Sequence, residues 1–382
     1  MSIRYFMNLR SDIFRNVSNI TGNRTRRKLI LLESDDWGSI RMPSLDAFKK
    51  LESHGLDLRT QDAERYNLND HLASSNDLEN LFEILNEAKD SIGQAAVMTP
   101  ITIVANPDFT KIRDSGFNEY YYEPFNHTIQ KFQGSDCTFK LWKEGIDKRL
   151  FVPQMHGREH LNVNAWMHDL RNREKKTLDA FNEGFWGYVP DRYPEVDYQA
   201  AFLLSKPDDL DSHASILTDG LNLFESLFGY RAVYFVPPNG PFNNELNKVL
   251  AENGVKLRAT STIQNEPLGY GQSRKVFHWQ GQKDKSGLIY TIRNCFFEPS
   301  QAGKDWVDSC LNDIKIAFRW NKPAIISTHR VNYIGALNVS NRSRGLMQLR
   351  LLLKSIMKNW PEVLFITSAD LGEQIINERC YD

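Results

Sequence analysis

Short apolar runs alternate along the chain with stretches in which apolar residues recur at helical spacing. The apolar runs predict seven strands, at residues 28–32, 95–105 (ending near Thr99), 150–155, 232–236, 255–259, 324–328 and 363–367. The periodic stretches predict helices at residues 44–54, 77–89, 212–228, 243–253, 305–318, 342–358 and 369–377. Such alternation is typical of βα units built around a mainly parallel sheet. The pattern therefore predicts the α/β class.

The βα pattern is interrupted by four longer segments, which are predicted insertions. They lie at about residues 57–75, 107–149, 178–210 and 263–296. In the last of them, residues 275–279 and 287–293 are expected to form an antiparallel pair of strands. A chain of 382 residues exceeds one average domain but suits a single α/β barrel that carries insertions. We expect one domain over residues 1–382, with its core at about 28–378.

The composition of the chain favours a globular protein over a nucleic-acid-binding or membrane-spanning one. The chain is 41% hydrophobic and 25% charged, which is globular, and its formal net charge of -1 argues against a nucleic-acid binder. Its 4 cysteines are widely spaced and form no CxxC pair, as expected in a reducing compartment. We see no signal peptide and no apolar run long enough for a transmembrane helix, so the expected location is cytoplasmic. The sequence predicts no particular oligomeric state.

Three predicted strands end in side chains that can carry out chemistry. Asp35 and Asp36 follow the first strand, His156 and His160 follow the third, and His329 follows the sixth. In parallel α/β barrels the catalytic groups lie at the carboxyl ends of the strands. We therefore expect these five side chains to meet at one face of the barrel.

The spacing of His156 and His160 suits metal binding, because residues four apart share one face of a helical turn. With Asp36 they would hold one divalent ion and leave a position for water, as in catalytic zinc sites. Zinc is the first choice, and iron, cobalt and nickel are alternatives. Asp35 would then be the general base and His329 the general acid. A turn or capping role for the aspartates, and packing roles for the histidines, remain open alternatives.

The order of these motifs resembles the polysaccharide deacetylase (NodB-homology) family over about residues 28–378. Residues 33–38 (ESDDWG) are similar to its first motif, 156–160 (HGREH) to its HxxxH motif, 235–240 (FVPPNG) to its third and 326–329 (ISTH) to its last. The resemblance implies a distorted (β/α)7 barrel of the polysaccharide deacetylase type with sizeable insertions. It further implies a metal-dependent hydrolase that removes an N- or O-acyl group, such as acetyl, from a carbohydrate.

The chain departs from the family pattern in its third motif. Val236 stands where the family has an arginine that orients the base, and Arg158, Arg293 and Arg330 are candidates to replace that arginine. Asn239 stands where the family has an aromatic residue that shapes the cleft. The family's aspartate that tunes the acid histidine is not recognisable in the sequence.

Four residues are expected to contact the carbohydrate: Trp37, Arg158, Asn239 and Arg293. Trp166 and Phe242 are further candidates, and packing is an equal alternative for Asn239 and for each aromatic residue.

Two other functions remain open at this point. An inactive barrel that binds metal or sugar is favoured by Val236 in place of arginine. A glycoside hydrolase needs two carboxylates that flank the scissile bond. Asp35 with Glu33 or Glu159 would supply such a pair.

Overall fold

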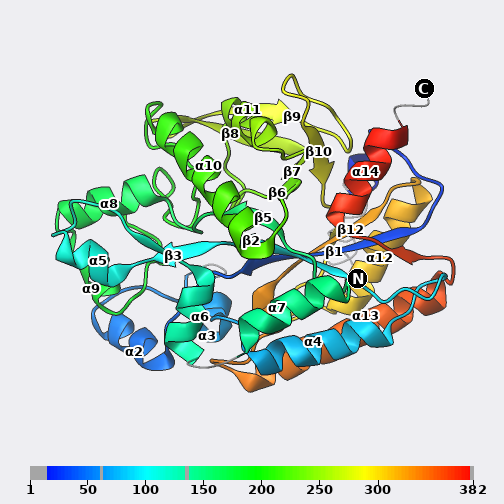
Figure 1. Ribbon diagram of the computed structural model, residues 1–382, viewed down its shortest axis with the longest axis horizontal. Coiled ribbons are helices and arrows are strands. Elements are labelled where there is room, and N and C mark those ends of the chain that lie inside the picture. The colour runs from blue at the N-terminus through cyan, green and yellow to red at the C-terminus, as the bar shows by residue number, and fades with distance from the viewer. Residues whose placement is uncertain (1–14, 61–62, 134–136, 379–382) are drawn as a thin grey trace, which may run out of the picture.

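The computed structural model describes residues 15–60, 63–133 and 137–378. Its centre is a parallel sheet (Figure 1) made of the strands β1 (Leu29–Trp37), β2 (Met98–Ile103), β5 (Gln154–Gly157), β6 (Tyr234–Phe235), β7 (Leu257–Thr260), β10 (Ile289–Ile292), β11 (Cys295–Phe296), β12 (Ala324–His329) and β13 (Leu364–Phe365). Their order is β10-β7-β6-β5-β2-β1-β12-β11, and β13 pairs with the beginning of β1. The sheet is curled into an open half-barrel with β10 and β11 at its edges. The α/β class and the distorted barrel expected from the sequence are thus confirmed.

Each of the seven strands predicted from apolar runs is present, as β1, β2, β5, β6, β7, β12 and β13. Several boundaries differ from the prediction, and two of these differences concern how β1 and β2 end. β2 continues to Ile103 instead of ending near Thr99, and β1 continues through both aspartates to Trp37. All residues of these two strands are buried, so no polar side chain on a solvated face marks where they end.

The predicted antiparallel pair within residues 263–296 is wrong. Residues 275–279 overlap β9 (Gln272–Phe277), which pairs antiparallel with β8 (Ile263–Gly269). Residues 289–292 instead run parallel to β7 at the edge of the main sheet. The short turn between β8 and β9 has positive φ angles at residues 269–271, which allows the two neighbouring strands to form a hairpin. Residues 275–277 therefore pair with the strand that directly precedes them in the sequence, and not with residues 287–293 as the sequence suggested.

Helices cover the sheet. The helices include α2 (Leu45–Ser53), α3 (Ala63–Asn69), α4 (Ser75–Glu87), α7 (Thr138–Asp147), α8 (Val163–Arg171), α10 (Asp209–Phe228), α11 (Asn247–Glu252), α12 (Trp306–Arg319), α13 (Val339–Asn359) and α14 (Ser368–Glu378). In Figure 1, α4, α7 and α13 lie together on one flank, and α10 and α11 lie on another with the β8–β9 hairpin. Among the described helices, none combines the length and apolar character that crossing a membrane requires.

Helix α13 packs against the short 3-10 helix that follows β12, and Gly345 makes this approach possible. A Cβ atom at Gly345 would stand 1.7 Å from the carbonyl oxygen of Asn332. Inside a helix, alanine is otherwise preferred over glycine by about 1 kcal/mol. If helix propensity decided the outcome, Gly345→Ala would raise the free energy of unfolding. If the close contact with Asn332 decides it, the substitution lowers that free energy.

We expect Gly345→Ala to lower the free energy of unfolding by roughly 1–3 kcal/mol, measured by denaturant titration, because the added methyl group overpacks the contact. Ser343→Ala changes an exposed position in the same helix and is the control, with an expected change below about 0.5 kcal/mol. A Gly345→Ala variant as stable as the unmodified protein would contradict this packing.

Candidate metal centre and cleft

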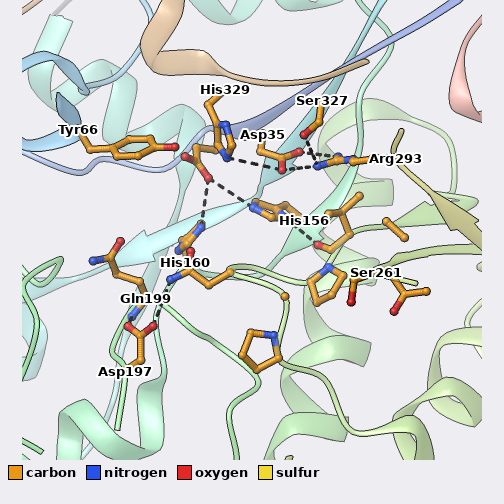
Figure 2. Close-up of a pocket in the computed structure, with 18 of the residues that line it drawn as sticks. Asp35, Tyr66, His156, His160, Asp197, Gln199, Ser261, Arg293, Ser327 and His329 are labelled. Carbon is orange, nitrogen blue, oxygen red and sulfur yellow. Dashed lines mark hydrogen bonds and ion pairs between the residues drawn. The ribbon is translucent and has the colours of Figure 1, made fainter. Parts of the chain in front are cut away.

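The parallel sheet brings the chemically active strand ends to one edge. β1 and β12 are neighbours, and their register places Asp35 directly opposite His329. His156 lies in β5, near the end of that strand, and Arg293 directly follows β10. Figure 2 shows Asp35, His156, His160 and His329 gathered around one point in the cleft. Side chains that are up to three hundred residues apart in the chain therefore share one site.

A local irregularity in β1 lets both aspartates face the cleft. Neighbouring side chains of a regular strand point to opposite faces. Here Asp36 has a φ of 73°, and the register between β1 and β2 shifts between Ser34 and Trp37. Such a bulge breaks the alternation and redirects side chains. Asp35 and Asp36 consequently both line the cleft, although they are adjacent in sequence.

Asp36, His156 and His160 form a buried cluster with the geometry of a metal site. The Asp36 Oδ1 atom lies 3.4 Å from His156 Nε2 and 3.2 Å from His160 Nε2. A tetrahedral ion with bonds of about 2.0–2.1 Å holds its ligand atoms roughly 3.3 Å apart. The separations in the protein match this spacing, so one ion fits among the three side chains.

The hydrogen bonding of His156 supports the same assignment. Its Nδ1 lies 2.7 Å from the carbonyl oxygen of Val236, which can only accept a hydrogen bond, so Nδ1 donates. In the neutral ring, Nε2 is then an acceptor that faces the Asp36 carboxylate. Two facing acceptors repel unless a cation or a proton lies between them. The fixed orientation of His156 thus suits a metal ligand whose second nitrogen is held by the backbone.

Arg293 contacts Asp35 in the way expected of the arginine whose place Val236 takes. Its guanidinium donates to both oxygens of Asp35, at 2.6 Å and 2.7 Å, and to Glu33 at 2.6 Å. Burial alone raises the pKa of Asp35, but the charge and hydrogen bonds of Arg293 outweigh it and lower the pKa overall. Asp35 is therefore held ionised and in one orientation. Of the three arginines considered from the sequence, Arg293 is the one that contacts Asp35, since Arg158 and Arg330 pair with other carboxylates.

His329 is held by Glu298, a residue that the sequence did not indicate. The Nδ1 atom of His329 lies 2.6 Å from Glu298 Oε1, and its Nε2 lies 3.9 Å from Asp35 Oδ2. Burial lowers the pKa of His329, but the Glu298 carboxylate more than compensates and raises it to about 9. His329 is thus protonated at neutral pH and points its other nitrogen toward the aspartates.

The cluster lies in a cleft of about 700 Å³. Asn239 and Arg293, both expected to contact substrate, line it. So does Tyr66, whose ring lies edge-on to His329 with 5.7 Å between the centroids. Opposite, Asn239 donates a hydrogen bond to Asp197 across 3.2 Å. The cleft wall therefore combines polar side chains with an aromatic ring.

Other residues expected in the cleft lie elsewhere. Trp37 is fully buried, where its ring packs edge-on against Phe151 with 4.8 Å between the centroids. Trp166 and Phe242 are likewise buried core residues. Arg158 does not line the cleft, since its guanidinium is engaged by Glu159 and Asp219. In the structure these four side chains make packing contacts or ion pairs, and none of them lines the cleft.

The carboxylate pair expected for a glycoside hydrolase is not assembled either. Glu33 is 1% exposed and accepts hydrogen bonds from Arg293, Tyr234 and Ser368. Glu159 is buried beside Arg158. Neither residue lines the cleft with Asp35.

Comparison with known proteins finds no match among family models and none among curated proteins. Solved structures do match. A provisionally assigned polysaccharide deacetylase from Mycobacterium smegmatis is 11% identical, covers 94% of each chain and has a TM-score of 0.47. PuuE allantoinase is 9% identical over 92% of this chain and 93% of that chain, with a TM-score of 0.46. A CE4 family pseudoenzyme from Bacillus anthracis is 10% identical over 91% and 66%, with a TM-score of 0.35.

The structural neighbours of this chain include polysaccharide deacetylases. This agrees with the resemblance expected from the order of the motifs. The likeness concerns the fold alone, and one of these neighbours is a pseudoenzyme. Any assignment of chemistry therefore depends on the site residues themselves.

The metal centre makes a direct prediction. Purified protein should bind one equivalent of a divalent ion such as zinc, measured by elemental analysis after dialysis. His156→Ala and His160→Ala should each weaken binding at least about tenfold, because each removes one of three ligands. His168→Ala alters a histidine on α8 that is mostly exposed, and serves as the matched control with unchanged metal content. Full occupancy in the His156→Ala variant would remove that residue from the ligand set.

Proposed function

We propose that this chain is a metal-dependent hydrolase that removes an acyl group, such as acetyl, from a carbohydrate. The observation that carries the proposal is the convergence of Asp36, His156 and His160 on one point, flanked by Asp35 and His329. A ligand set of two imidazoles and one carboxylate suits zinc, and iron, cobalt or nickel are alternatives. A metal held there would polarise the acyl carbonyl and lower the pKa of a bound water.

The flanking residues have complementary tasks. Asp35, ionised and oriented by Arg293, accepts a proton from the attacking water. His329, protonated because of Glu298, donates a proton to the leaving nitrogen or oxygen of the sugar. Asp35 and His329 lie opposite each other on adjacent strands, so the proposed base and the proposed acid face the same part of the cleft.

The geometry favours this function over the alternatives. An inactive barrel was suggested by Val236 in the place of arginine, but Arg293 supplies a guanidinium to Asp35 from another strand end. A glycoside hydrolase requires two carboxylates that flank the scissile bond, and the two partners considered for Asp35, Glu33 and Glu159, do not line the cleft. Asp36 does line it, but its carboxylate is in contact with His156 and His160.

The roles of Asp35 and His329 can be tested by substitution. We expect Asp35→Asn and His329→Ala to lower acetate release from acetylated sugars by about 10²–10⁴-fold, because each removes a proton-transfer group. Metal content should be retained, since neither residue is assigned as a ligand. Asp46→Asn, at an exposed position of α2, is the control for Asp35→Asn. Two variants with unimpaired turnover would overturn both assignments.

The ion pair between His329 and Glu298 predicts a pH effect. Glu298→Gln removes the negative charge that raises the pKa of His329 to about 9, so this pKa should fall toward its ordinary value of 6.5. His329 then loses its proton at a lower pH than in the unmodified protein. The alkaline limb of kcat/KM should therefore move to lower pH by one unit or more (about tenfold in proton concentration). Glu373→Gln, exposed on α14, is the control. An alkaline limb that stays in place would show that Glu298 does not tune the acid.

A further inference from the structure

Arg41 is a buried cation in the cleft wall, and the described residues form no ion pair with it. It follows β1, lines the cleft and is 7% exposed. Its Nε is buried and makes no hydrogen bond, and within the described part of the chain no carboxylate forms an ion pair with it. Its guanidinium carbon lies 4.6 Å from the centre of the Tyr66 ring, over the ring face. The side chain is therefore positioned by stacking, which leaves its hydrogen-bond donors free.

The other arginines around the cleft differ from Arg41 in this respect. Arg293 is paired with Asp35, Arg65 with Glu298, and Arg330 with Asp70. Asp70 is close enough for its charge to interact with Arg41, but its oxygens accept three hydrogen bonds from Arg330. A buried charge that lacks a partner is unfavourable. Arg41 is thus a buried cation to which the part of the chain that the structure describes supplies no paired anion.

The location of Arg41 connects it to the candidate active site. Tyr66 contacts Arg41 through its face and His329 through an edge-on arrangement, so one aromatic ring separates the guanidinium from the proposed acid. Thr60 also lines the cleft, and among the described residues its buried hydroxyl has no hydrogen-bond partner. Two residues of one cleft wall therefore each carry a buried donor that the described residues leave unpaired.

We propose that Arg41 binds an anionic group of the substrate, so that the cleft takes an acidic carbohydrate. The planar guanidinium matches the oxygens of a carboxylate or a phosphate, to which it donates paired hydrogen bonds. The sugar would carry that group at one end while its acyl group lies at the metal centre. This inference rests on the proposed function for the reaction, but the anion site can be measured without any turnover.

The test compares three sugars that have no acyl group to hydrolyse: glucose, glucuronic acid and glucose 1-phosphate. Equilibrium binding to the unmodified protein should favour at least one anionic sugar over glucose by about 10- to 100-fold, as expected for hydrogen bonds to a charged group. A preference for glucuronic acid identifies a carboxylate, and a preference for glucose 1-phosphate identifies a phosphate. Equal binding of all three, or no binding, overturns the proposal, and this arm needs no variant to fold.

The second arm assigns the preference to Arg41. In Arg41→Gln the ratio of anionic to neutral affinity should fall to about one, with unfolding temperature monitored as a check on folding. Arg231→Gln removes the same charge from an exposed position before β6, where Glu225 is its partner, and should keep the preference. If Arg41→Gln keeps the preference as well, the anion binds elsewhere and the proposal fails. Absence of acyl hydrolysis with intact anion preference would instead count against the proposed reaction alone.

Discussion

The parallel alignment of β1 and β12 is the constraint on which the site depends. It places Asp35 opposite His329, and the bulge at Asp36 turns the next carboxylate toward the same space. β5 and the loop that follows it then bring His156 and His160 to face Asp36. Backbone geometry thus concentrates two carboxylates and three imidazoles at the carboxyl edge of one sheet, a location where parallel α/β proteins carry their chemistry.

Charge balance explains how so many ionisable groups coexist there. Asp35 is compensated by Arg293, and His329 by Glu298, which also accepts from Arg65. Asp36 differs, because its contacts are two imidazole nitrogens. A divalent cation at that point would neutralise the carboxylate and remove the repulsion between facing acceptors. The carboxylate and the two rings are therefore best understood as one unit with an ion, while Asp35 and His329 are balanced without it.

Much of this arrangement could be predicted from the sequence, because apolar runs mark buried strands and the residues that follow them mark the functional edge. The seven strands and the group of Asp36, His156 and His160 were found in this way. Arg293 was one of three candidates, and only the fold could choose, since β10 joins the sheet in parallel to β7 and not in the expected hairpin. Glu298 lies just after β11, a strand of only two residues that was not among the strands predicted from the sequence.

The errors have physical causes as well. Trp37 is the last residue of the strand that carries the aspartates. The bulge that turns Asp36 toward the cleft leaves the Trp37 indole in the core, where it donates a hydrogen bond to Ser34. Arg158 lies between the metal-ligand candidates His156 and His160 in the sequence. Its guanidinium nevertheless donates a hydrogen bond to Asp219 on α10. A residue next to a site residue in the sequence therefore need not point into the site. The direction of its side chain depends on the residues with which it forms hydrogen bonds and ion pairs.

The most direct test of the account is a crystal structure of the purified protein measured at the absorption edge of the metal it contains. The account predicts one anomalous peak in the cleft, within bonding distance of an Asp36 carboxylate oxygen, His156 Nε2 and His160 Nε2, with Asp35 unbonded and held by Arg293. A peak bonded to other residues, or His156 rotated away from Asp36 with no metal between them, would contradict it.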